Sequence, residues 1–452
     1  MGGNRLAWLL RKLGLDRPEA RAWAMYDWAN SAMVTTIVTA IFPIYFLSVA
    51  AAELAGDEAQ ARYSEATVIA LATIAVLAPV LGALADIRAA KKRFLAAFAL
   101  MGVLSVAGLF FVGHGEWKLG LVLFALANIG AAGSVVFYDS LLPHVAAEGR
   151  MDQLSTSGYA LGYVGGGLLL ALNLAWVRFP QAFGLPAGEG LSPDEETLPA
   201  RLAFLSVALW WGFFTIPILR RVKEPSLVYE RDEAPGTPVT RLAFQRVFET
   251  FKDLRRYRQA FLMLLAFLIY NDGIATVIRM AAIYATDRDI DEFVTIGTIL
   301  IVQFVGIPFS FLFGHLAGSV GAKRMVTFGL IVYAGICVFA YFMETDTHFV
   351  LLGLLVAVVQ GGTQGLSRSL FGSMVPRHKS AEFFAFFAIG EKFAGIFGPL
   401  MFLLVISLTG TAQNAILSIM VFFVIGGAIL LRVNVDEGRR LAAQSDAETW
   451  RP

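Results

Sequence analysis

The chain has 452 residues, of which 57% are hydrophobic, 43 are glycine and only 16% are charged. Soluble domains carry about 25% charged residues, and even a large one leaves about a quarter of its chain surface in water. The composition excludes a soluble domain, a disordered chain and a disulfide scaffold, and it predicts a membrane protein. The single cysteine, Cys337, allows no internal disulfide or cysteine zinc site. The net charge of +1 gives no reason to expect a nucleic-acid partner.

Long apolar runs follow one another along the whole chain. A membrane-spanning helix needs about 20 apolar residues, and twelve runs meet this length. The predicted spans are Ala22–Val49, Ala66–Leu84, Phe94–Val112, Leu119–Leu142, Gly158–Val177, Leu202–Leu219, Phe261–Tyr284, Val294–Leu316, Met325–Met343, Phe349–Val375, Phe383–Leu408 and Ala412–Leu431. A membrane β-barrel would instead show alternating segments of about 10 residues.

The first twenty residues are too polar for a cleavable signal, because Arg5, Arg11, Lys12 and Arg17 interrupt the leucines. This segment is typical of a short basic amphipathic helix on the membrane surface.

Basic residues lie mostly on one side of the predicted spans. With the N-terminus inside, the outer segments hold only Arg62, Lys118, Arg178, Arg201 and Arg288, and most other Lys and Arg residues are inside. The positive-inside rule therefore predicts cytoplasmic termini in a multi-pass protein of the inner or plasma membrane.

The longest polar stretch, between Arg220 and Arg258, divides the spans into two sets of six. The predicted organisation is a cytoplasmic N-terminus (1–20), a six-helix bundle (21–222), a cytoplasmic central loop (223–258), a second six-helix bundle (259–432) and a cytoplasmic tail (433–452). In the loop, Leu242, Val247, Phe248, Phe251 and Leu254 alternate with basic residues as in an amphipathic helix on the inner surface. We expect a passive linker there, with regulation as the alternative.

The two sets of spans are internal repeats. Gly82 and the basic pair after it recur as Gly314 and its basic pair 232 positions later, while Pro143 and Pro376 match at 233. A register held through separate elements indicates a repeat. Parallel six-span repeats are the design of major facilitator transporters, so we expect an all-α membrane protein with twelve transmembrane helices and that fold.

Polar residues within the spans agree with this fold. An ionisable group in the membrane costs at least about 2.5–3.5 kcal/mol and therefore faces a bundle interior or an aqueous cavity. Spans one, four, seven and ten, which line the cavity of the facilitator fold, contain Asp27, Asn30, Asn128, Asp139, Asn271, Asp272, Arg279, Gln360, Gln364 and Arg368.

Span ten presents a polar face. Gln360, Gln364 and Arg368 are spaced by four and stack on one side of a helix. The guanidinium group of Arg368 suits an anionic or zwitterionic ligand. The alternative is that Arg368 pairs with Glu391 at a similar depth of span eleven.

Two further acids have distinct expected roles. Asp272 lies near mid-membrane, where a desolvated carboxyl group is a candidate for carrying a proton; the alternative is a structural pair with Arg279. Asp139 lies near the inner mouth, where we expect it to cap or gate. The glycine-rich face of span five needs no ligand, because close helix packing explains it.

Several segments resemble the vacuole effluxer-like branch of the major facilitator superfamily. They are the segment from Arg21 to Ser31, the Tyr270–Gly273 stretch, the Gln360–Ser369 stretch and the Ala381–Phe384 stretch. The resemblance covers essentially the whole chain and implies a twelve-helix facilitator fold. Eukaryotic members of this branch are associated with amino-acid export from the vacuole.

The loop after span two resembles the gating motif of the superfamily. Asp86 is present, Arg88 follows it, and the basic pair is displaced to Lys91 and Lys92. The resemblance implies that Asp86 caps a helix of the other half when the transporter is open to the outside. The second copy has Gly318 in place of the aspartate, so we expect a one-sided latch.

We therefore expect a secondary active transporter that moves a small zwitterion such as an amino acid, with protons as a possible coupling ion. We expect a monomer in the lipid bilayer, with no cofactor and no metal. The alternatives are a carrier of sugars or cell-wall fragments, a drug exporter, or a non-transporting receptor or scaffold. An enzyme is disfavoured because the sequence shows no nucleophile–base pair or metal-ligand spacing.

Overall fold

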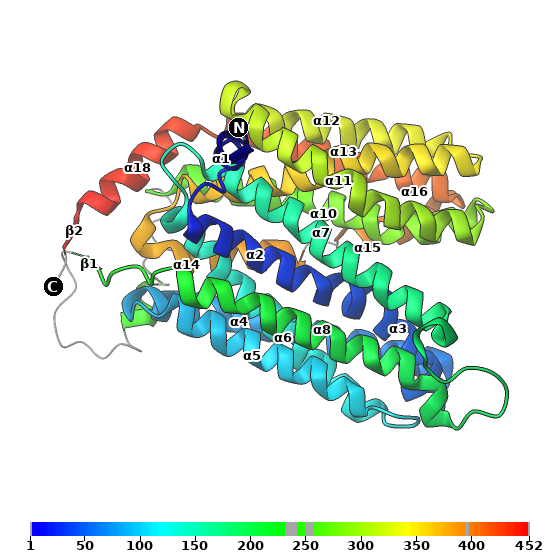
Figure 1. Ribbon diagram of the computed structural model, residues 1–452. Helices are drawn as coiled ribbons and strands as arrows, with labels where there is room; N and C mark the ends of the chain where they lie inside the picture. The colour runs from blue at the N-terminus through cyan, green and yellow to red at the C-terminus, as the bar shows by residue number, and fades with distance from the viewer. Residues whose placement is uncertain (1, 231–241, 247, 249–255, 394–396, 451–452) are drawn as a thin grey trace.

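Long helices lie side by side in the computed structural model, which describes residues 2–230, 242–246, 248, 256–393 and 397–450 (Figure 1). Eleven helices in this part of the chain are long and apolar enough to cross a membrane, and one shorter apolar helix, Phe397–Thr409, accompanies them. The predicted twelve-helix major facilitator fold is confirmed.

The N-terminal half, as we call α2 to α8, follows a short first helix. Its elements are α1 (Gly2–Lys12), α2 (Pro18–Ala32), η1 (Met33–Ala40), α3 (Ile41–Tyr45), η2 (Phe46–Ala50), α4 (Gly56–Ile87), α5 (Lys91–Gly108), η3 (Leu109–Phe111), α6 (Trp117–Val145), α7 (Met151–Arg178), η4 (Pro180–Phe183) and α8 (Pro193–Arg221).

The C-terminal half, as we call α10 to α17, follows the short strand β1 (Tyr229–Glu230) and precedes a tail. Its elements are α10 (Arg258–Asp287), α11 (Glu292–Val320), α12 (Ala322–Tyr341), α13 (Asp346–Gly372), η6 (Arg377–Lys379), α14 (Ser380–Phe393), α15 (Phe397–Thr409), α16 (Ala412–Ser418) and α17 (Met420–Arg432). The tail consists of α18 (Val435–Ala447) and β2 (Thr449–Trp450). The predicted eleventh span covers α14, α15 and residues 394–396, which lie outside the described part.

Side chains at the helix starts satisfy free backbone amides. Ser192 and Glu195 form a reciprocal capping box at α8, and Asp291, Thr345 and Asn434 accept hydrogen bonds from the first turns of α11, α13 and α18. Such caps typically contribute about 0.5–2 kcal/mol each.

The first predicted span is interrupted by π-helical segments and is not one regular α-helix. Residues Met33–Ala40 and Phe46–Ala50 are π-helical, and the amide of Ile41 bonds to the carbonyl of Thr36, five residues back. Pro43 lies between the two segments and has no amide hydrogen to donate, which disrupts regular helical bonding around it. Wide turns of this kind are frequent at functional sites.

Helix α1 lies toward the same end of the bundle as α18 and the β1–β2 ladder, at the left of Figure 1. We call this end the terminal face.

The N-terminal helix is shorter than predicted, because α1 ends at Lys12 and α2 begins at Pro18. Ser157 of α7 donates a hydrogen bond to the carbonyl of Leu13, so this segment packs on the protein.

The two halves meet chiefly along α4 against α14 and along α7 against α11. At the first crossing, a Cβ added to Gly82 would lie 2.5 Å from the carbonyl oxygen of Ala381. At the second, a Cβ on Gly314 would overlap the hydroxyl of Thr156. The glycines that mark the repeat in the sequence therefore lie at equivalent contacts between the halves.

Much of the amphipathic helix predicted in the central loop, including Val247, Phe251 and Leu254, lies outside the described residues. Leu242 and Ala243 are described, and they pack against Ala83 and Ile87 at the terminal end of α4.

Candidate functional site

The last turns of α4 contact the start of α14, in the other half. Asp86 follows Gly82 by one helical turn on the same face, and its carboxylate accepts a hydrogen bond of 3.0 Å from the backbone amide of Glu382. Glu382 is the third residue of α14, so its amide is one of those that a helix leaves free at its start. This is the contact that the resemblance implied for Asp86.

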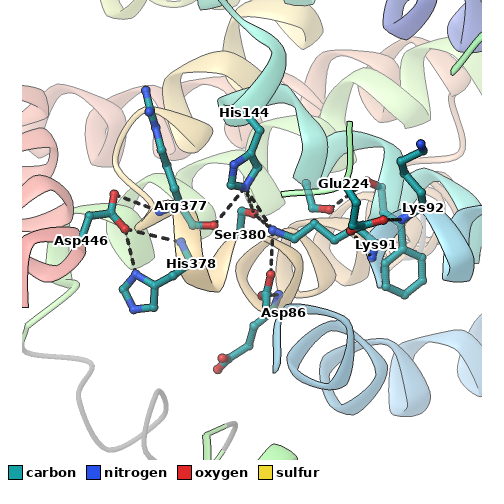
Figure 2. A network of polar contacts seen from close by, with 12 residues as sticks. Asp86, Lys91, Lys92, His144, Glu224, Arg377, His378, Ser380 and Asp446 are labelled. Atoms are coloured by element: carbon teal, nitrogen blue, oxygen red, sulfur yellow. Dashed lines mark hydrogen bonds and ion pairs between the residues drawn. The ribbon is translucent and has the colours of Figure 1, made fainter. Parts of the chain in front are cut away.

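Lys91 extends this contact into a network (Figure 2). Its side chain is only 3% exposed; its Nζ lies 2.8 Å from Asp86 Oδ1 and donates a 2.7 Å hydrogen bond to the Ser380 hydroxyl. The imidazole of His144 lies 3.1 Å from the same Nζ and 3.1 Å from the carbonyl of Arg377. The network therefore joins the ends of α4, α5 and α6 to the start of α14.

Glu224, just after the N-terminal half, fixes the start of α5. Its two carboxylate oxygens accept hydrogen bonds of 2.7 and 2.9 Å from the amides of Lys91 and Lys92. An anion at a helix N-terminus is stabilised by the helix dipole as well as by these bonds. Of the residues predicted to gate, Arg88 is exposed, and Lys92 joins the network through its backbone amide.

The C-terminal tail packs onto the same region. Asp446 of α18 contacts the Nδ1 of His378 at 2.8 Å and accepts hydrogen bonds from the amides of Arg377 and His378 (Figure 2). These contacts of the tail could not be predicted from the sequence, because only the fold brings Asp446 close to Arg377 and His378.

A hollow of about 2040 Å³ opens on the terminal face between loops of both halves. Asp86, Lys91 and His144 line it, whereas Asp27, Asp139 and Arg368 do not. The contacts of Asp86, Lys91 and His144 therefore join the two halves where the hollow meets the helix ends.

Deeper in the bundle, Arg368 of α13 crosses from the C-terminal half to the N-terminal half. Its Nη1 lies 2.9 Å from Asp139 Oδ1 and its Nη2 lies 3.1 Å from Asp27 Oδ2. The Nε donates to the Ser155 hydroxyl at 2.9 Å, and Nη2 also donates to the Ser155 carbonyl at 2.8 Å. We call Asp27, Asp139 and Arg368 the charge triad.

Aromatic rings enclose the guanidinium group. Its central carbon lies 4.6 Å from the ring centre of Tyr159, 4.9 Å from that of Trp23 and 5.4 Å from that of Tyr138. The Tyr138 hydroxyl donates a 2.7 Å hydrogen bond to Asp27, and Trp23 stacks on Tyr138. These contacts hold the charged groups in one geometry and exclude water from most of their surface.

The glycine face of α7 makes the charge triad possible. A Cβ on Gly158 would overlap the Asp27 carboxylate and lie 3.0 Å from Arg368 Nη2, and one on Gly162 would lie 2.6 Å from the Ser31 hydroxyl. The predicted close packing of span five is therefore present, and it is against α2.

The other predicted pathway residues are not gathered around Arg368. Asn271 and Gln364 contact one another at 3.4 Å, and Asp272 accepts a 3.2 Å hydrogen bond from the amide of Gly398, in the first turn of α15. Gln360 lines a small apolar cavity of about 130 Å³ within the C-terminal half. The side chain of Asn30 is buried, whereas that of Arg279 is exposed.

One interpretation of the sequence needs correction. Arg368 pairs with Asp27 and Asp139 and not with Glu391, because α13 faces α2, α6 and α7 at this depth. Asp139, for which we expect a capping or gating role, is a buried partner of Arg368.

Sequence reasoning also missed Trp23, Tyr138, Ser155 and Tyr159. Trp23 and Tyr138 lie four and one residues from the two acids, which is the only signal that the sequence offers for them.

Two helical bundles joined by a charge triad and by a latch at one end define a transporter of the major facilitator type. The fold matches that of a major facilitator transporter, FucP, in the outward conformation, with a TM-score of 0.67 at 13% identity over 92% of this chain and 100% of that chain. It also matches the proton:xylose symporter XylE, with a TM-score of 0.66 at 13% identity over 94% of this chain and 95% of that chain.

The chain belongs to the vacuole effluxer Atg22-like family, which it matches over residues 61–443. It is 37% identical to the uncharacterized MFS-type transporter YxiO of Bacillus subtilis (strain 168), over 95% of this chain and 97% of that protein. It is 26% identical to autophagy-related protein 22-1 of Aspergillus niger over 66% of this chain, a match that spans 49% of the longer fungal protein.

Proposed function

We propose that this membrane transporter moves a small zwitterion, such as an amino acid, by alternating access. We also propose that it spans the plasma membrane and that its terminal face lies on the cytoplasmic side. The positive-inside distribution of Lys and Arg supports this orientation. The resemblance to the vacuole effluxer-like branch supports the substrate class.

The observation that carries the proposal is the position of the charge triad. Asp27, Asp139 and Arg368 lie on α2, α6 and α13, which correspond to cavity-lining spans one, four and ten, and they join the halves by ion pairs. Charged groups are retained inside a membrane bundle where they serve a substrate or ion pathway. The triad and the Asp86 latch hold the terminal face closed, and both must separate when that face opens.

Uptake into proteoliposomes tests the substrate class. The purified protein is reconstituted and offered radiolabelled amino acids, with sugars and lipophilic cations as comparison substrates, in the presence and absence of a pH gradient. We expect saturable amino-acid uptake that falls in Arg368→Lys, because a lysine cannot make the forked contact to two carboxylates. Arg324→Lys, at an exposed position of α12, is the matched control and retains uptake.

A protein that moves none of the amino acids under either condition refutes the substrate class. Uptake of sugars alone would favour a sugar carrier, and uptake of many lipophilic cations that is insensitive to Arg368→Lys would favour a drug exporter.

A further inference from the structure

We propose that the Asp27–Asp139 pair around Arg368 is the proton-binding site of this transporter, and that Asp272 is not. The inference rests on the proposed transport function and specifies its coupling ion and the residues that bind it.

The first argument is the balance of charge. The side chains of Arg368, Asp139 and Asp27 are 3%, 5% and 19% exposed, so one guanidinium group faces two carboxyl groups in a nearly dry site. An uncompensated charge in such a site is strongly unfavourable. One proton shared by the Asp27–Asp139 pair removes the excess negative charge of the charge triad. Glu391 of α14 is a partly exposed acid whose charge also acts on Asp139, and it makes proton binding more favourable still.

The second argument is the set of groups that surround the pair. The charged and titratable side chains that the structure places against it are Arg368 from α13, Tyr26 from α2, Tyr138 from α6, Tyr159 from α7 and Glu391 from α14. Arg368 is the cation of this described set, and it is already bonded to both acids and to Ser155. Proton binding is therefore the means of neutralisation that requires no rearrangement of these groups.

The third argument concerns access. Asp27 is the most exposed member of the charge triad, and its Oδ2 accepts hydrogen bonds from Tyr138 and Arg368. Asp139 is enclosed more tightly. Asp27 is therefore the point of exchange with water, and Asp139 shares the proton within the site.

The fourth argument links the proton to the conformational change. Arg368 belongs to the C-terminal half, whereas both acids belong to the N-terminal half. When the terminal face opens, both acids leave Arg368 and meet water, where each is stable as an ionised carboxylate without a shared proton. A ligand shifts such an equilibrium only by binding one state better, so the proton favours the conformation in which the terminal face is closed.

Asp272 lies in another part of the bundle. It accepts a hydrogen bond from the amide of Gly398, within the C-terminal half. A proton there would leave the ion pairs of Arg368 with Asp27 and Asp139 in place.

The test begins with a measurement that needs no substrate. Spin labels are placed at Arg93 and Arg324, exposed residues at the starts of α5 and α12 in opposite halves, and the distance between them is followed by double electron–electron resonance against pH. The native Cys337 is buried. We expect the long-distance population to grow as the pH rises, and we expect Asp27→Asn and Asp139→Asn to make the distribution independent of pH.

The second measurement is uptake driven by a pH gradient. In Asp27→Asn and Asp139→Asn we expect the stimulation by the gradient, taken as the ratio of uptake with and without the gradient, to fall by about 5- to 150-fold, the usual range for coupled sites. The matched control is Asp152→Asn, because Asp152 also lies between the halves but bonds to the Ser369 hydroxyl. It keeps both the stimulation and the pH-dependent distances.

The outcomes separate the two proposals. Gradient-driven uptake that persists in both Asp27→Asn and Asp139→Asn, or that is lost in Asp272→Asn alone, overturns the proton site. Wild-type protein that shows pH-dependent distances, abolished in the two variants, but moves no amino acid refutes the substrate class and leaves the proton site standing. Unchanged elution on size exclusion and a cooperative thermal unfolding transition show that the variants are folded.

Discussion

Gly82 determines how closely the two halves approach at the terminal face, and Gly82→Ala tests this directly. The added Cβ would lie 2.5 Å from the carbonyl oxygen of Ala381, 2.8 Å from its carbonyl carbon and 3.0 Å from Cα of Glu382. All three atoms belong to the backbone of α14, which cannot move aside by a change of rotamer. Restoring an ordinary contact requires α4 and α14 to separate by about 1 Å, and overpacking of this kind typically costs about 1–3 kcal/mol.

The cost falls on the closed conformation alone, because α14 moves away from Gly82 when the terminal face opens. Since 1.4 kcal/mol corresponds to a tenfold change in an equilibrium constant, we expect the substitution to shift the population toward the open conformation by about 5- to 150-fold. The distance between spin labels at Arg93 and Arg324 measures this shift.

The matched control is Gly335→Ala in α12, where a Cβ meets no atom within 4 Å and alanine improves helix propensity by about 1 kcal/mol. It leaves the distance distribution unchanged. If Gly82→Ala also leaves the distribution unchanged, the closed conformation does not depend on the contact between Gly82 and α14, and the reasoning is refuted.

Further predictions concern the charge triad, the latch and the tail. Gly158→Ala places a methyl group on the Asp27 carboxylate; it should lower the thermal stability by about 1–3 kcal/mol and slow transport, and normal uptake would contradict the geometry. Glu224→Gln weakens the charged cap of α5 and should cost about 0.3–1 kcal/mol in thermal unfolding, less at high salt. Asp446→Ala leaves the His378 imidazole and two backbone amides without this acceptor; it should cost about 1–3 kcal/mol, and an unchanged melting temperature would show that the tail is not held there. A metabolite that binds the folded protein at 100 times its Kd should stabilise it by about 2.7 kcal/mol, which a thermal-shift screen detects.

The sequence predicts the spans well because hydrophobic length is a local property of the chain. The resemblance of the loop after span two to the gating motif also implies the Asp86 contact, and Asp86 accepts a hydrogen bond from the amide of Glu382. The partners of Arg368 could not be predicted in this way. They depend on which helices of the other half face α13, and an internal repeat relates the halves without specifying how they dock.

Other features arise only in the folded protein. The π-helical turns around Pro43 depend on how a disrupted helix finds new hydrogen bonds, and a hydropathy pattern does not report them. The docking of Asp446 on His378 joins segments that are 68 positions apart. The sequence of α18 (Val435–Ala447) is polar. It does not indicate which part of the chain this helix contacts.

The two-stranded ladder at the terminal face has a mechanical meaning. Tyr229 and Glu230 pair with Trp450 and Thr449, so the strand that precedes the C-terminal half is hydrogen-bonded to the strand that follows it. The two chain segments that flank the C-terminal half are therefore joined to each other by backbone hydrogen bonds. We expect these two strands to move together when the halves rock.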